Sequence, residues 1–340
     1  MSAPPLGKFR KRPQTNPRPA PPFPSYSTCV PGDPKPPVPT RFFRGGLPAV
    51  KLQANLLLLL TSVIWGFGFI AQRLGMDHIG PYSFNVFRFL LGALSLVPLV
   101  YFLGRKKTRP SKIGKPFWII GGLAGLVLFG GATLQQVGLL YTTAGKAGFI
   151  TGLYLVIVPL LGFCLRQKID KLTLAGALIA TYGLYLLSIT EGFNIGQGDT
   201  LVLIGAFFWA MHVQVVGYAA KYKLDALKLA ILQYLICAGL NLLLALFLEE
   251  FTVQATLDAS GAILYAGLVS VGVAYTLQIV AQKHVDPSRA AILLSLEAVF
   301  AVLAGWLMLD ELLNSRESWG CILMFAGMML SQMPGLGKKE

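Results

Sequence analysis

Ten apolar segments follow one another through most of this chain. They lie near 52–72, 82–103, 117–140, 145–165, 172–190, 200–220, 228–248, 260–281, 288–309 and 317–334. A helix of about 20 residues crosses the ~30 Å hydrocarbon layer of a membrane. Lipid offers the backbone no hydrogen-bond partner, so a spanning segment must pair its own amides and carbonyls as a helix. The sequence therefore predicts an all-α integral membrane protein with ten transmembrane helices.

The overall composition excludes a large water-soluble domain. Of the 340 residues, 54% are hydrophobic and only 13% are charged, whereas soluble domains carry about 25% charged residues. The four cysteines form no CxxC pair and no Cys/His cluster, so we predict no metal site, no disulfide framework and no cofactor. These cysteines are Cys29, Cys164, Cys237 and Cys321.

The first 48 residues differ from the rest of the chain. They contain 14 of the 21 prolines and no apolar periodicity. Such a segment buries too little surface to offset the entropy lost on ordering, so we predict a disordered cytoplasmic tail over 1–48. The tail also lacks the apolar core of a signal peptide. Two interpretations remain open: a recruitment segment, or a dispensable extension that includes a start site assigned too far upstream.

The distribution of charge predicts the orientation in the membrane. Sixteen of the 29 Lys and Arg residues lie beside the loops after the second, fourth, sixth and eighth segments, or at the C-terminus. The alternate loops are acidic and carry only Arg73, Lys146 and Arg316. Cytoplasmic loops are enriched in Lys and Arg, so we predict a multi-pass protein of the cell (inner) membrane with both termini cytoplasmic. The same pattern explains the net charge of +14 without a nucleic-acid partner.

A long-range repeat runs through the apolar region. Residues 133–135 (Thr-Leu-Gln) recur as 276–278, and the cation Lys146 recurs as Arg289, both at an offset of 143 positions. At an offset of 144 positions the matching pairs include Trp65 with Trp209, Gly176 with Gly320 and Gly183 with Gly327. We therefore divide the chain into repeats over 52–190 and 200–334. Each holds five segments, and because five is odd the second must enter the membrane from the opposite side.

Inverted repeats are the architecture of carriers that work by alternating access. Three alternatives are weighed against a carrier. A duplication can serve folding alone; a channel would need a filter sequence, which is not visible; and a lipid-modifying enzyme would need a catalytic cluster. The three histidines are far apart, and no Walker motif is present. We expect membrane lipid and a small-molecule substrate as partners, and a monomer or homodimer.

Three motifs, together with the count of ten apolar segments, carry a family resemblance. They are Ile-Trp-Gly at 64–66, LQQVGLLYTTAGKAGFITGLYLVIVP at 134–159, and SLEAVFAVLAGWLMLDE at 295–311. Over 52–334 the chain resembles a drug/metabolite transporter with two EamA domains. That resemblance implies a secondary active transporter for a small polar metabolite or drug-like solute. We expect an exporter driven by the proton gradient.

Charged residues inside the apolar segments are the first candidates for the transport site. Glu297 lies near the middle of its segment, where a charged side chain costs roughly 2.5–3.5 kcal/mol on insertion scales. It either binds a cation or a proton, or serves as a neutral structural acid. Arg88 either receives a substrate carboxylate, or reaches outward or to an acid of a loop. Lys146 is a candidate for substrate contact or gating, and as a cation near a helix N-terminus it requires a compensating anion.

Uncharged residues complete the candidate set. Gln135 and Gln278 are repeat partners that could face one cavity from two sides, or form interhelical hydrogen bonds. Trp65 and Trp209 are either cavity-lining or core residues. Tyr154 lies 143 positions before Glu297 and is therefore its repeat partner.

Overall fold

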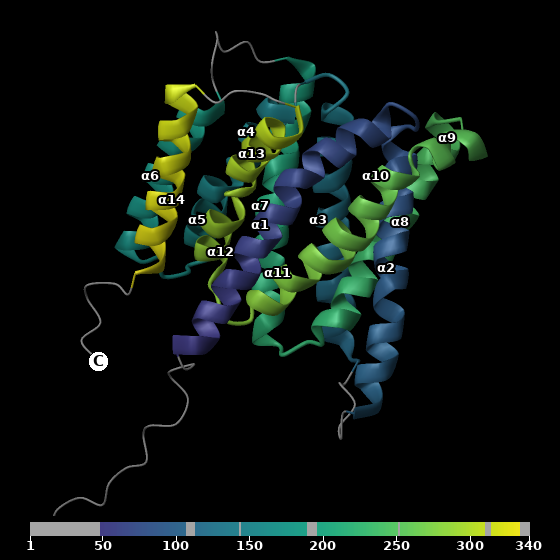
Figure 1. Ribbon diagram of the computed structural model, residues 1–340. Helices are drawn as coiled ribbons and strands as arrows, with labels where there is room; N and C mark the ends of the chain where they lie inside the picture. Colours follow the sequence, from purple (N-terminus) through teal and green to yellow (C-terminus); the bar gives the residue numbers. More distant parts are fainter. Residues whose placement is uncertain are drawn as a thin grey trace, which may run out of the picture. The chain divides into compact units, whose positions relative to one another are not determined.

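The computed structural model describes residues 48–106, 113–142, 144–188, 196–250, 252–309 and 314–333. These residues belong to one compact unit, Gly45–Glu340, and in the described ranges they form helices and no strand (Figure 1). The predicted disordered tail lies outside the described residues, except for Pro48, which begins the first helix.

Helices cover every expected apolar segment. The first half contains α1 Pro48–Met76, α2 Pro81–Lys106, α3 Lys115–Gly138, α4 Ala144–Gly152, α5 Tyr154–Cys164 and α6 Lys171–Ser188. The second half contains α7 Gln197–Lys221, α8 Ala226–Leu248, α9 Val253–Asp258, α10 Ser260–Leu264, the π-helix η1 Tyr265–Tyr275, α11 Thr276–Ala281, α12 Pro287–Leu294, α13 Glu297–Leu309 and α14 Ser315–Gln332.

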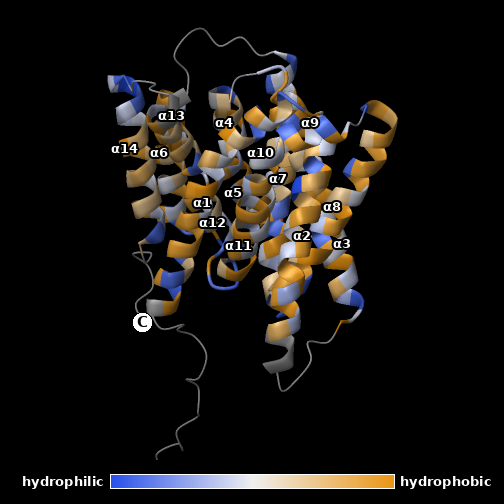
Figure 2. Ribbon diagram, turned by 45° about the vertical axis from the view of Figure 1, so that its right-hand side comes forward, coloured by the Kyte–Doolittle hydropathy of each residue, from blue (hydrophilic) through white to orange (hydrophobic). Residues whose placement is uncertain are grey.

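Eight stretches in the described ranges are long and apolar enough to cross a membrane. Figure 2 shows hydrophobic residues along most of the length of these helices. The large apolar side chains with the highest exposed fractions include Phe163 and Phe247. Such a surface suits contact with lipid rather than water. The other two expected segments correspond to α6, a shorter apolar helix, and to α14, which is not among the eight.

The helices α6 and α14 pack directly against each other through glycines. A Cβ atom on Gly176 would lie 2.5 Å from the main-chain oxygen of Gly327, and one on Gly183 would lie 2.7 Å from that of Gly320. Only residues without side chains allow backbones to approach this closely. Because the earlier glycine of α6 faces the later glycine of α14, the two helices run antiparallel.

Three of the expected segments are not uniform α-helices. The segment at 145–165 is interrupted at Leu153. The amide of Leu153 donates a hydrogen bond of 3.2 Å to the main-chain oxygen of Ile150, which closes a tight turn. The segment at 288–309 is interrupted at 295–296, and the segment at 260–281 contains η1. The two interruptions fall at corresponding places in the two repeats. Hydropathy does not reveal them, because the residues on both sides are equally apolar.

Acidic residues complete the N-terminal ends of two helices. The carboxylate of Glu249 accepts hydrogen bonds from the amides of Tyr82 and Ser83 at the start of α2, at 2.8 and 2.7 Å. Glu317 reaches the amide of Asn314 at the start of α14, at 2.9 Å. The first amides of a helix have no partner within it, and its dipole favours negative charge there. These contacts account for part of the acidity of the loops.

Candidate functional site

A buried pocket lies among helices from both halves of the chain. We call it the central pocket, and it is lined by Trp65, Phe69, Gln72, Arg88, Gln135, Thr151, Tyr154, Trp209, His212, Val213, Ser270, Tyr275, Gln278, Leu294 and Glu297. Seven of the eight candidates from the sequence are in this list, and Lys146 is not. The structure thus brings together residues up to 232 positions apart, from Trp65 to Glu297.

Arg88 on α2 is a buried cation that forms no ion pair with any described residue. Its side chain is only 3% exposed, and its guanidinium lies over the rings of Phe84 and Phe89, at 5.7 and 4.9 Å. Its Nε and Nη2 atoms have no hydrogen-bond partner among the described residues. The alternatives of an outward-reaching side chain or a pairing with a loop acid are therefore wrong for this structure. These two donor atoms, Nε and Nη2, remain available to an anion.

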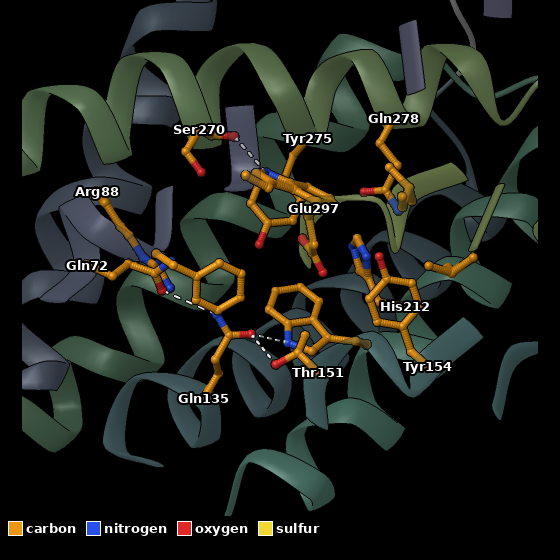
Figure 3. Close-up of a pocket in the computed structure, with 15 residues that line it drawn as sticks. Gln72, Arg88, Gln135, Thr151, Tyr154, His212, Ser270, Tyr275, Gln278 and Glu297 are labelled. Carbon is orange, nitrogen blue, oxygen red and sulfur yellow. Dashed lines mark hydrogen bonds between the residues drawn. The ribbon is translucent and has the colours of Figure 1, made fainter. Parts of the chain in front are cut away.

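Glu297 is the first residue of α13, directly after the interruption at 295–296. It is 4% exposed, and its Oε1 atom has no hydrogen-bond partner in the described part of the chain. Figure 3 shows its carboxylate in the middle of the pocket, with the hydroxyl of Tyr154 facing it and Arg88 farther away. Within the described ranges it forms no ion pair with Arg88. The pocket thus holds two separate ionisable groups, one basic and one acidic.

Gly66 allows α1 to lie against the start of α13. A Cβ atom at this position would be 2.8 Å from the main-chain oxygen of Glu297 and 2.6 Å from the Cβ of Phe300. Its neighbour Trp65 lines the pocket and donates from Nε1 to the main-chain oxygen of Ser270 on η1, at 3.4 Å. The Ile-Trp-Gly motif therefore supplies a side chain that lines the pocket, Trp65, and a glycine that allows close backbone contact, Gly66.

Gln135 on α3 connects three other polar residues of the pocket. Its Oε1 atom accepts from Trp209 Nε1 at 2.8 Å and from Thr151 Oγ1 at 3.4 Å, while its Nε2 donates to Gln72 Oε1 at 3.4 Å (Figure 3). This network joins α1, α3, α4 and α7. Its repeat partner Gln278 donates to Gln282 at 3.1 Å and leaves its own Oε1 unpartnered among described residues. The two amides both line the pocket, but only one belongs to this network.

An aromatic cluster forms another part of the pocket wall. Tyr275 at the end of η1 lies with its ring centroid 4.6 Å from that of Trp65, 5.9 Å from that of Trp209 and 6.2 Å from that of His212. The Nε2 atom of His212 lies 3.0 Å from Gln233 Oε1. His212 and Tyr275 had no distinguishing pattern in sequence, since one is a lone histidine and the other lacks a repeat partner of its type.

Lys146 occupies a different part of the fold. Its Nζ atom lies 2.9 Å from Oδ2 of Asp199 at the start of α7. The expected compensating carboxylate is therefore present, and it comes from the other half of the chain. Asp199 also accepts from Thr142 and from the amide of Gly196. In the sequence, Asp199 is one of several acidic residues in the alternate loops, and no pattern distinguishes it from the others.

The pocket has little free space in this structure. The space open to water molecules is about 40 Å³, enough for roughly three waters at 10–15 Å³ each. Within the described ranges no group of three or more His, Cys, Asp or Glu residues could hold a metal ion. The chemistry that remains is hydrogen bonding, charge pairing and proton exchange. A larger solute requires the lining residues to move apart.

A polar pocket enclosed by apolar membrane-length helices is typical of a membrane transporter. The model of the EamA-like transporter family matches residues 52–189 and 196–333. The chain therefore belongs to the EamA-like transporter family, and it is a multi-pass membrane transporter rather than an enzyme.

Relatives support this assignment. The chain is 32% identical over 290 residues to an uncharacterized transporter of Archaeoglobus fulgidus, covering 84% of this chain and 88% of the relative. It is 24% identical over 293 residues to a probable amino-acid metabolite efflux pump of Salmonella typhimurium, covering 82% and 94%. A crystal structure at 18% identity has a TM-score of 0.70 over 84% of this chain and 99% of that one, so the fold is shared.

Proposed function

We propose that this protein exports a small zwitterionic metabolite of amino-acid type across the cell membrane, by alternating access coupled to protons. One observation carries this proposal. A guanidinium with unpartnered donor atoms, that of Arg88, and a separate carboxyl group, that of Glu297, lie in the same buried pocket. A buried charge without a partner is costly in a membrane and commonly marks a substrate or ion pathway.

The two charges suit the two ends of an amino acid. The guanidinium of Arg88 presents donors in a planar fork that matches a carboxylate. Glu297 can accept from an ammonium group, and the aromatic rings around it can hold an apolar side chain. The name of the Salmonella relative, a probable amino-acid metabolite efflux pump, supports this class of solute.

Glu297 is also the residue we propose for coupling. A carboxylate can bind either a proton or the cationic end of a solute, because the protonated, neutral acid no longer attracts a cation. If the solute leaves on one side and a proton replaces it, the charge on Glu297 stays compensated throughout the cycle. The driving force is then the proton gradient, with outward movement of solute exchanged for inward movement of protons.

Ten crossings in two inverted repeats would supply the alternating access. The antiparallel contact of α6 and α14 supports inversion, because the glycines involved are repeat partners. The small volume of the pocket supports a cycle in which one side must open. The excess of basic residues in one set of loops supports cytoplasmic termini.

The test is transport in proteoliposomes. Vesicles with an acidic lumen should accumulate radiolabelled amino acids from a panel, and Glu297→Gln should abolish the dependence on the pH gradient while the variant still inserts and folds. Glu250→Gln removes an exposed carboxylate and should transport at the wild-type rate. Unchanged gradient-driven transport by Glu297→Gln would remove this residue from the mechanism.

A further inference from the structure

Two ion pairs join the two halves of the chain at opposite ends of the helical unit. Lys146 of α4 pairs with Asp199 of α7 at 2.9 Å, and Arg289 of α12 pairs with Asp170 at 3.6 Å. Lys146 and Arg289 are repeat partners, and each is the third residue of its helix. In each pair the cation comes from one repeat and the carboxylate from the other. The pairs are therefore matching contacts that both cross the boundary between the repeats.

The two pairs are separated by the length of a membrane-spanning stretch. The stretch Lys146–Cys164 has 19 residues, which corresponds to about 28 Å of helix. Asp170 follows its far end, beside the start of α6. Figure 1 likewise shows α4 toward the top of the view and α12 toward the bottom. The first pair thus lies near one end of the helical unit and the second near the other end, where we expect the two mouths of the pocket.

Each pair is also connected to the central pocket by a short half-helix. Lys146 stands eight positions before Tyr154, and Arg289 stands eight positions before Glu297. Between each cation and its pocket residue lies one of the two helix interruptions, at Leu153 or at 295–296. The half-helices α4 and α12 are therefore separate from α5 and α13.

The position of each cation suits a contact that forms and breaks during transport better than a permanent one. A cation in the first turn of a helix is unfavourable by about 0.3–1 kcal/mol, which the carboxylate offsets. The side chains of Arg289 and Asp170 are 24% and 34% exposed, that of Lys146 is 38% exposed and that of Asp199 is 5% exposed. Water can therefore reach both cations and Asp170 when a pair separates, while Asp199 keeps its hydrogen bonds from Thr142 and from the amide of Gly196. A partly exposed ion pair such as Arg289–Asp170 contributes little to stability and can break in each cycle.

We propose that the two ion pairs are the gates of the transporter: Lys146–Asp199 closes one mouth and Arg289–Asp170 closes the other. This inference rests on the alternating access proposed above. It assigns a gating role to all four residues of the two pairs. In a transport cycle one pair breaks while the other holds, so the pocket opens to one side at a time.

The experiment measures access to the pocket from each side. Ser270→Cys, in a full-length chain whose four native cysteines are replaced by serine, places one thiol in the pocket wall. A membrane-impermeant maleimide is applied to right-side-out and to inside-out vesicles. Asp199→Asn should raise the labelling rate from the Lys146 side and lower it from the Arg289 side. Asp170→Asn should do the reverse, each by about twofold to fivefold given the energy of such a pair.

Two controls separate gating from general loosening. Asp258→Asn removes an exposed carboxylate of α9 that lies outside both pairs, and it should leave both labelling rates unchanged. The charge swap Lys146→Asp with Asp199→Lys should return the labelling pattern toward that of the parent. If the cysteine-replaced chain does not fold, trypsin cleavage rates of the native chain and of the two Asn variants, measured separately on each face, take the place of labelling.

The outcomes distinguish the gates from the proposed function. If gradient-driven amino-acid transport occurs but the two Asn variants leave labelling unchanged, or shift it in the same direction, the gate assignment is overturned and the proposed function stands. If none of the amino acids is transported but the two variants shift labelling in opposite directions, the gates are supported and the substrate class is wrong.

Discussion

At the scale of residues, the function that we propose depends on two buried ionisable groups that do not pair with each other. Arg88 and Glu297 line the same pocket without forming an ion pair with each other or with another described residue. Pairing them would lower the cost of burial, but it would also remove both groups from the solute. The aromatic rings beside Arg88 lower that cost in part through cation–π contacts. The arrangement favours binding over stability.

Replacement of Arg88 should therefore weaken solute binding without weakening the fold. Arg88→Gln is expected to reduce the affinity for an amino acid by about tenfold to a hundredfold, since hydrogen bonds to charged groups contribute about 1.5–3 kcal/mol. Arg88→Lys keeps the charge but loses the planar fork, and should have an intermediate affinity. Equilibrium binding of a labelled amino acid in detergent measures this. An unchanged affinity for Arg88→Gln would contradict the carboxylate assignment.

At the scale of elements, close helix contacts depend on residues without side chains. The contact between α6 and α14 has main-chain atoms facing main-chain atoms at Gly176, Gly183, Gly320 and Gly327. A backbone cannot move aside as a flexible side chain can. The repeat explains why both helices carry glycine at matching positions, because a two-fold-like contact places each glycine against the partner of the other.

Gly183→Ala should destabilise the protein. Its new Cβ would lie 2.7 Å from the oxygen of Gly320 and 2.7 Å from the amide of Met324, and overpacking of this kind costs about 1–3 kcal/mol. The midpoint of thermal unfolding in detergent should fall. Gly122→Ala is the matched control, because a Cβ there meets nothing within 4 Å. Equal midpoints for the two variants would show that the α6–α14 contact is looser than in this structure.

At the scale of the whole molecule, the arrangement of the two repeats determines what the pocket can do. Each repeat supplies one cation near a mouth and one member of the glutamine pair Gln135 and Gln278 to the pocket, but only the second supplies a carboxylate, whose counterpart is Tyr154. A second carboxylate at the position of Tyr154 would place two acids in one pocket, whereas the single acid Glu297 can exchange one proton for one solute cation. The asymmetry is therefore part of the coupling that we propose.

The proposed orientation places Cys164 on the cytoplasmic side and α9 on the outer side. Cys164 is an exposed thiol at the end of α5, so an impermeant maleimide should label it in inside-out vesicles only. Asp258→Cys, in a chain whose four native cysteines are replaced by serine, should be labelled in right-side-out vesicles only. Labelling of both thiols from the same side would contradict an odd number of crossings between them.

Much of the site was predictable because the membrane restricts where polar residues can be. Arg88 and Glu297 stand out in apolar segments, and the repeat selects Gln135, Gln278, Trp65, Trp209 and Tyr154; the structure places all seven in the pocket. Gln72 and His212 were not predicted to line it. An isolated polar residue in a helix is equally consistent with a core hydrogen bond, and its direction depends on how the helix is rotated.

The sequence by itself determined the helical membrane class, the family and the repeat, because these follow from segment length, hydropathy and residue identity along one chain. Tertiary structure decided which charges are paired. Lys146 meets Asp199 and Arg289 meets Asp170, while Arg88 has no counter-ion among the described residues. It also decided where the helices at Leu153 and at 295–296 are interrupted. Such contacts depend on the rotation and approach of helices far apart in sequence, which hydropathy and spacing do not record.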